Sequence, residues 1–366
     1  MLGFFLFLFT VARVPHYPVI AAITLYALST RRKSIENGYN KNKNFMINIL
    51  LFLVFITFNS IIYGFITGNF QIPNFYLLPF CLICALSLNE QDIKIFFLCL
   101  AIECFFGFYE YSLGITTILP GGNLQEFSSD EMLYDKRAFG LSTNSSAFAA
   151  KLLFAFFVLI QFKDIVSKRI WIVLCLSFLG GMFVSFNRTI IVVFVFFIIC
   201  IYFNKIKNLF KKNKLIAFSI VMVISFLFVY IITKEGSEIY RQFNRGSDEE
   251  LYLSGRPIIW EAFFDFISNH LLMGNGSAHL LVPYYSGPIH AHNSFIQLIA
   301  DHGIPLSIYF LIVIFSKVNR KNIIVCISIF IASMVQYEIF WGFSATDVFF
   351  YAFLLNSKFL NRKIVV

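Results

Sequence analysis

The chain has 366 residues, of which 58% are hydrophobic and only 13% are charged, and its formal net charge is +9. Soluble globular domains are about 45–50% apolar and about 25% charged, so this composition excludes an ordinary cytosolic enzyme and a disordered chain. Because a hydrocarbon core of about 30 Å needs about 20 residues per helix, about eleven or twelve spans would use most of the apolar residues. We therefore expect one all-α polytopic membrane domain over residues 1–366.

The N-terminal segment allows two interpretations. Met1 to Ala12 is too short to cross a bilayer, and Arg13 and Pro15 interrupt the apolar run that continues after it. Either one long tilted helix ends at Thr30, or a short helical hairpin does, and we favour the hairpin. Further spans are expected in chain order at 45–67, 75–88, 95–115, 144–162, 170–187, 189–204, 215–233, 293–316, 322–337 and 343–357.

The basic residues indicate how the chain is oriented. They cluster at 31–43, 163–169, 205–214, 317–321 and 358–363. Cytoplasmic loops of membrane proteins are enriched in Lys and Arg, and the predicted spans place all these clusters on one side. The positive charge is thus a topology signal and does not favour nucleic-acid binding. We expect a bacterial inner-membrane protein whose two longer polar segments, residues 116–143 and 234–292, face the periplasm.

The second polar segment contains a predicted amphipathic helix. It begins after Gly255 with Arg256 and Pro257, a residue that the first turn of a helix tolerates. Its apolar residues recur at helical spacing and are Trp260, Phe263, Phe264 and Ile267. Such a helix lies in the membrane interface, or it packs the loop on the helix bundle, and both can hold.

Two outer-face arginines are candidates for binding an anion. Arg188 lies at a turn between two apolar helices, where it either snorkels at a helix end or binds an anion at the membrane surface. Arg256 lies at a helix N-terminus, where the helix dipole disfavours a cation unless an anion binds there too. A pyrophosphate would resolve that conflict.

All but one of the six histidines lie between residues 270 and 302. His290 and His292 have the alternate spacing of a zinc site, but no Cys or tight carboxylate spacing supports one, so we expect no metal and no cofactor. His292 ends the loop where the next span begins, and its imidazole can take a proton from a sugar hydroxyl near neutral pH. The alternative is a histidine that only caps the span.

The segment from Arg256 to Gly303 resembles the O-antigen ligase and O-antigen polymerase family of bacterial envelopes. The resemblance rests on Arg256 with Trp260, on Gly274-Asn275-Gly276, and on His292-Asn293 followed after nine residues by Gly303. Arg137-Ala138-Phe139-Gly140 with Asn144, and Ser185 with Arg188, look like the family's earlier outer-face motifs. Leu306 stands where the ligase form has its final glycine, which weakens the ligase-specific form of the motif.

The resemblance implies a glycosyltransferase of the C-type superfamily that uses undecaprenyl-pyrophosphate-linked glycans on the periplasmic face. Arg188 and Arg256 would stabilise the departing pyrophosphate, His292 would activate the acceptor hydroxyl, and Asn293 would orient the acceptor or the imidazole. The other candidate substrate contacts are Arg137, Arg241, Arg245, Tyr284 and Tyr285. Membrane lipids, a chain-length regulator and a flippase of the same pathway are the expected partners.

Three functions remain open at this point. We favour an O-antigen polymerase because the outer loops are compact and the last glycine of the motif is missing. An O-antigen ligase, which transfers the finished chain to the lipid A core, is the second interpretation. A flippase or exporter of the lipid-linked sugar is the third, because Glu103 and Lys151 fall near the middle of consecutive spans. A mutual ion pair is the simpler explanation of those two charges.

Overall fold

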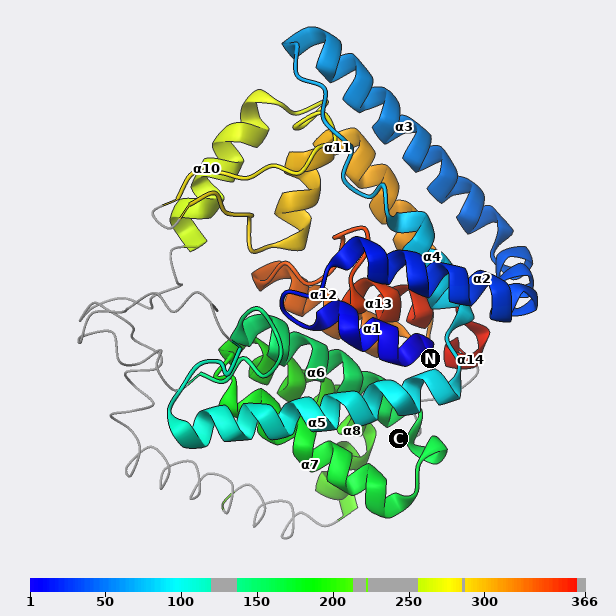
Figure 1. The fold of residues 1–366 in the computed structure, drawn as a ribbon, viewed down its shortest axis with the longest axis vertical. Helices are drawn as coiled ribbons and strands as arrows, with labels where there is room; N and C mark the ends of the chain where they lie inside the picture. Colours follow the sequence, from blue (N-terminus) through cyan, green and yellow to red (C-terminus); the bar gives the residue numbers. More distant parts are fainter. Residues whose placement is uncertain (120–136, 213–221, 223–255, 285–286, 361–366) are drawn as a thin grey trace.

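A computed structural model of the chain describes residues 1–119, 137–212, 222, 256–284 and 287–360, and the regular elements among them are all helices (Figure 1). The α-helices are α1 (Leu2–Thr10), α2 (His16–Lys41), α3 (Lys43–Thr67), α4 (Leu78–Ser87), α5 (Glu90–Leu113), α6 (Ser145–Gln161), α7 (Lys168–Val184), α8 (Arg188–Lys212), α10 (Arg256–Asn269), α11 (Ser294–Phe315), α12 (Ile323–Val335), α13 (Ala345–Leu355) and α14 (Ser357–Leu360). The all-helical class predicted from composition is confirmed.

Two of these helices, α3 and α11, are long and apolar enough to cross a membrane. Shorter apolar helices are α4, α6, α12, α13 and the first part of α8. Only a third of the apolar window of α3 is buried, and Leu50, Phe65 and Ile66 on this helix are 61%, 76% and 70% exposed. An apolar surface of this kind favours contact with lipid. The expected number of spans stays a prediction.

Each predicted span among the described residues coincides with a helix, and 215–233 lies outside them. The poorest agreement is at 75–88, because α4 begins only at Leu78 and has 10 residues. Phe75, before α4, has a φ of +68°, a value incompatible with a helix. At 1.5 Å per residue α4 is about 15 Å long, which is half the thickness of a hydrocarbon core.

The N-terminal segment is a helical hairpin. Helices α1 and α2 pack against each other and are joined by a turn in which Arg13 has a φ of +67°. Pro15 precedes α2, where a missing N–H donor costs nothing. The hairpin interpretation is therefore confirmed, and a single long helix ending at Thr30 is wrong. Helix α2 continues to Lys41, with a break at Arg31.

The helices form three neighbouring groups. Helices α5, α6, α7 and α8 lie together, α1, α2, α4, α12 and α13 occupy the centre, and α3, α10 and α11 lie on the other side of the centre (Figure 1). Contacts of α1 with α5, of α12 with α8 and of α11 with α12 connect these groups. The centre therefore lies between the group of α5 to α8 and the group of α3, α10 and α11 (Figure 1).

The charges at the middle of consecutive helices form an ion pair. Lys151 Nζ of α6 lies 2.6 Å from Glu103 Oε1 of α5, and both side chains are at most 4% exposed. The same carboxylate accepts from the Leu141 N–H at 2.9 Å and from the Ser142 hydroxyl at 3.1 Å. The mutual pair predicted for Glu103 and Lys151 is confirmed. The Glu103 carboxylate also holds Leu141 and Ser142, which precede α6, against α5.

Helix α10 is amphipathic, but its buried stripe differs from the predicted one. Ile259 and Phe263 are buried, and Trp260 and Ile267 pack around them. Phe264, predicted to share that face, is 54% exposed, so its assignment is wrong. The buried side is defined by the 280–291 loop and α11, which cover the side of α10 that carries Ile259. The helix therefore packs its own loop on the bundle, and Phe264 lies on the open side.

Candidate active site

The segment that carries His290 and His292 is held from both sides. Trp260 of α10 donates its indole N–H to the Ala291 carbonyl at 2.8 Å. The Ala291 N–H in turn donates to Gln297 Oε1 of α11, also at 2.8 Å. Helices α10 and α11 thus fix the backbone between the two histidines. This explains why the tryptophan and the histidine motif occur together in the sequence.

His292 is a neutral imidazole in an unusual backbone conformation. Its φ is +49°, and its N–H donates to His290 Nδ1 at 3.1 Å. Burial, together with the positive charge of Arg256, lowers the pKa of His292 to about 4. Burial, with the neighbouring His292 and His279, lowers the pKa of His290 to about 3. Arg256 and His292 therefore lie close enough to interact, and at neutral pH both imidazoles can accept a proton.

Asn293 caps α11. Its Oδ1 accepts from the Phe295 and Ile296 N–H groups at 2.9 and 3.1 Å, and its Nδ2 donates to the Met334 carbonyl at 2.7 Å. These bonds engage both polar atoms of the side chain. Asn293 therefore fixes the backbone directly after His292, and the predicted orientation of the acceptor or the imidazole by Asn293 stays a prediction.

The glycines of the motif let two backbones approach closely. Gly303 breaks α11 with a φ of +77°, and a Cβ at this position would collide with the Leu272 carbonyl. Gly274, with a φ of +56°, lies against the backbone of Ala300 and Gly303. Across this contact the Ile304 N–H donates to the Leu271 carbonyl at 2.8 Å. The glycine spacing thus joins the loop after α10 to the broken α11.

Asp301 connects the loop to α11. Its carboxylate accepts from Gln297 Nε2 at 2.7 Å, the Leu280 N–H at 2.8 Å and Asn74 Nδ2 at 2.9 Å. His279 Nδ1 lies 3.1 Å from it. The carboxylate is fully buried, so these donors replace its solvation. Asp301 therefore holds Asn74 and the 279–280 segment against α11.

Arg188 is the first residue of α8 and is half-buried. Asn187 before it accepts from the Ile190 N–H at 3.2 Å and donates to Ser146 Oγ of α6 at 3.0 Å. Ser146 lines a cavity that His292 also lines. Arg188 is therefore one residue from a side chain that contacts the wall of this cavity. Arg137 lies near the same turn, since the next N–H, that of Ala138, donates to the Val184 carbonyl at 3.1 Å.

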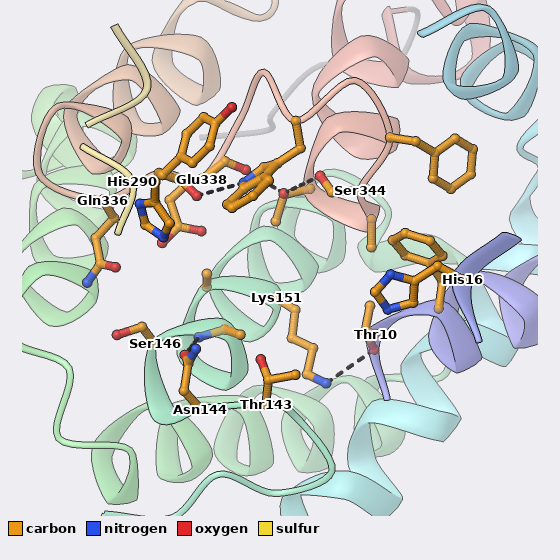
Figure 2. A pocket seen from close by; sticks show the side chains of 18 of the residues that line it. Thr10, His16, Thr143, Asn144, Ser146, Lys151, His290, Gln336, Glu338 and Ser344 are labelled. Atoms are coloured by element: carbon orange, nitrogen blue, oxygen red, sulfur yellow. Dashed lines mark hydrogen bonds between the residues drawn. The ribbon is translucent and has the colours of Figure 1, made fainter. Parts of the chain in front are cut away.

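This cavity has a volume of about 580 Å³. Figure 2 shows His290, Gln336 and Glu338 on one side of it, Asn144 and Ser146 on another, and Lys151 with Thr10 beyond them. It is walled by the α1–α2 hairpin, the start of α6, the histidine segment and the loop between α12 and α13. Segments from both ends of the chain thus meet beside His292.

The remaining candidate substrate contacts are Tyr284, Tyr285, Arg241 and Arg245. Tyr284 packs against the small apolar cluster around α10. Arg241, Arg245 and Tyr285 lie outside the described residues. Among the residues that the structure describes, no group of three His, Cys, Asp or Glu side chains is placed to hold a metal ion. The cavity residues of the 336–346 loop were not among the predicted site residues, although a polar interruption between two apolar runs is visible there.

Residues 172–311, from α7 into α11, match the model of the O-antigen ligase family. The chain carries a domain of the O-antigen polymerase and ligase family. The match includes Arg188, Arg256 and His292, and it confirms the family inferred from the motifs without separating polymerases from ligases. Members of this family are glycosyltransferase-like membrane enzymes that act on lipid-linked glycans. No curated protein matches the chain.

Proposed function

We propose that this O-antigen family protein is a polymerase. It joins undecaprenyl-pyrophosphate-linked repeat units on the periplasmic face of the inner membrane. The observation that carries the proposal is the position of Arg256 and His292 at the starts of α10 and α11, which are clamped together through Trp260 and Ala291. Arg188 begins α8 directly after Asn187, which donates to Ser146 on the wall of the cavity that His292 lines. Helix N-termini with guanidinium groups attract a diphosphate, and a neutral imidazole beside them accepts a proton.

In the proposed reaction the acceptor hydroxyl oxygen attacks the anomeric carbon of the donor sugar. The new glycosidic bond forms as the bond to pyrophosphate breaks, the hydroxyl proton moves to His292, and undecaprenyl pyrophosphate leaves with the bonding electrons. Arg188 and Arg256 stabilise the charge that develops on the leaving group, and planar guanidinium groups bind phosphate oxygens in pairs. Asn293 and Trp260 fix the backbone on either side of His292.

The arginine and histidine roles are tested by extension of a lipid-linked repeat unit with purified protein. Arg188→Ala, Arg256→Ala and His292→Ala each lower the rate by about 100-fold or more while the protein stays folded, because each removes a group that acts on transition-state charge or on the proton. Arg320→Ala, at an exposed arginine of the α11–α12 turn, is the matched control and keeps full activity. EDTA does not inhibit. Full activity in Arg256→Ala or His292→Ala contradicts the mechanism.

Polymerase and ligase are separated by the acceptor. The compact outer loops, and Leu306 in place of the motif's last glycine, favour the polymerase. Extension of a lipid-linked repeat supports the polymerase, and labelling of core lipid A supports the ligase. The flippase alternative is weakened because Glu103 and Lys151, its supporting charges, neutralise each other. In the polymerase pathway a flippase and a chain-length regulator would be partners of this protein.

A further inference from the structure

The loop between α12 and α13 presents a buried carboxyl group to the cavity beside His292. Glu338 is 7% exposed, lines the cavity, and no hydrogen-bond or ion-pair partner of its carboxyl lies among the described residues. Its backbone is fixed on both sides. Its N–H donates to Ser294 Oγ of α11 at 3.2 Å, and its carbonyl accepts from the Thr346 hydroxyl. Its carboxyl oxygens are open to the cavity, where they can hydrogen-bond a ligand.

The other walls of the cavity supply the groups that recognise a sugar. Trp341 stacks on Tyr337 with ring centroids 3.9 Å apart, and it is 39% exposed. Its indole N–H already donates to the Tyr337 carbonyl at 2.8 Å, so only its ring is offered to a ligand. Asn144 and Ser146 of α6 present amide and hydroxyl groups opposite (Figure 2). Ligand sites commonly have volumes of about 300–1,000 Å³ and combine aromatic walls with a few polar groups.

The charges of the cavity argue against a phosphate in this position. Among the described residues of the lining, Lys151 is the cation, and this ammonium group is already paired with Glu103 at 2.6 Å. Glu338 adds a carboxyl group near the histidine end. The described lining therefore has no unpaired cation for a diphosphate, whereas Arg188 and Arg256 lie at the starts of α8 and α10. The cavity suits the uncharged, hydroxyl-bearing part of a substrate.

We propose that this cavity is the acceptor-sugar site and that the Glu338 carboxyl hydrogen-bonds a hydroxyl of the acceptor glycan, next to the hydroxyl that His292 activates. The inference rests on the proposed function. It adds the place of the acceptor, whose sugar ring packs on Trp341. It also makes Glu338 a residue that determines acceptor affinity. The diphosphate then binds Arg188 and Arg256.

The protonation state of Glu338 agrees with this role. Burial raises the pKa of Glu338 to about 8, so its carboxyl is protonated at neutral pH and both donates and accepts. Among the described residues, the other titratable groups on the cavity lining are His16, Lys151, His290, His292 and Tyr337. Above pH 8 the carboxylate only accepts, and acceptor binding weakens. A glutamine keeps a donor and an acceptor at any pH.

Binding of the free repeat-unit oligosaccharide, released from the lipopolysaccharide of the source strain, tests the proposal without the reaction. Saturation-transfer NMR on full-length protein measures it. Glu338→Leu and Ala147→Phe, which fills the cavity from an exposed position on α6, each weaken binding by about tenfold or more. Ala21→Phe, the same change at an exposed position of α2 outside the cavity, leaves binding unchanged. Glu338→Gln binds normally at pH 7 and, unlike the unaltered protein, equally well at pH 9.

The possible outcomes distinguish a failure of the acceptor-sugar site from a failure of the proposed polymerase function. If the unaltered protein does not bind the oligosaccharide, or if Glu338→Leu and Ala147→Phe both bind it normally, the proposal is overturned. The binding assay is repeated in Arg320→Ala, the exposed control on the α11–α12 turn, where the site predicts unchanged oligosaccharide affinity. Glu338-dependent binding without any chain extension contradicts the polymerase and keeps the sugar site. Extension with an unchanged acceptor KM in Glu338→Leu contradicts the sugar site and keeps the polymerase.

Discussion

The hydrogen bond from Trp260 to the histidine segment gives the sharpest prediction for activity. Trp260→Phe keeps a large ring on α10 but removes the donor to the Ala291 carbonyl, which lies 2.8 Å away in a fully buried residue. An unsatisfied buried carbonyl costs about 1–3 kcal/mol. If that cost falls on the geometry of His292, the rate drops by about 5-fold to 150-fold, since about 1.4 kcal/mol corresponds to a factor of ten.

The assay measures chain extension per folded protein together with thermal unfolding in detergent. Trp171→Phe is the matched control, because Trp171 of α7 also donates to a backbone carbonyl, that of Leu159 at 3.3 Å, outside the cavity. We expect Trp260→Phe to lower kcat with little change in acceptor KM, and Trp171→Phe to lower only the unfolding temperature. Equal activities of the two variants would refute the reasoning that Trp260 positions His292.

The remaining predictions concern stability and pH. Lys151→Met leaves the Glu103 carboxylate buried and unpaired and lowers the free energy of unfolding by about 3–5 kcal/mol. Adding Glu103→Gln removes the buried charge and recovers most of that stability. Equal unfolding temperatures of the single and double variants would count against the pair. Because the pKa of His292 is lowered to about 4, its imidazole stays neutral as the pH falls through 6.5. On the acid side of the pH profile, kcat/KM therefore declines only near pH 4. A decline centred near 6.5 would contradict this. Gly303→Ala lowers the unfolding temperature more than Gly68→Ala, since both have positive φ but only Gly303 faces a packed backbone.

Much of the helical arrangement could be predicted from local patterns. Apolar runs of sufficient length gave helices close to their observed bounds, because burial and the lack of water force helices on such sequences. The Glu103–Lys151 pair was predictable because two opposite charges in consecutive apolar runs have few other partners. The N-terminal hairpin followed from Arg13 and Pro15. The stripe of α10 was partly wrong, since the covering loop determines which side of an amphipathic helix is buried.

The candidate site was predictable only in part. The motif identified Arg256, Trp260 and His292 as candidates. The structure adds backbone contacts of Trp260 and Asn293 that sequence spacing alone does not show. The cavity was missed because its walls come from the N-terminal hairpin, α6 and the α12–α13 loop. Glu338 is separated from His292 by two helices in sequence, so no local pattern connects them. Its approach depends on how α11, α12 and α13 pack.

The central claim is that a lipid-linked diphosphate binds where Arg188, Arg256 and His292 meet. A cryo-electron microscopy structure of the full-length protein in lipid nanodiscs with undecaprenyl pyrophosphate tests it most directly. The account predicts phosphate density within hydrogen-bonding distance of both guanidinium groups, with the His292 imidazole beside it and the sugar cavity open next to it. Diphosphate bound elsewhere, with Arg188 turned toward the lipid, would contradict the account.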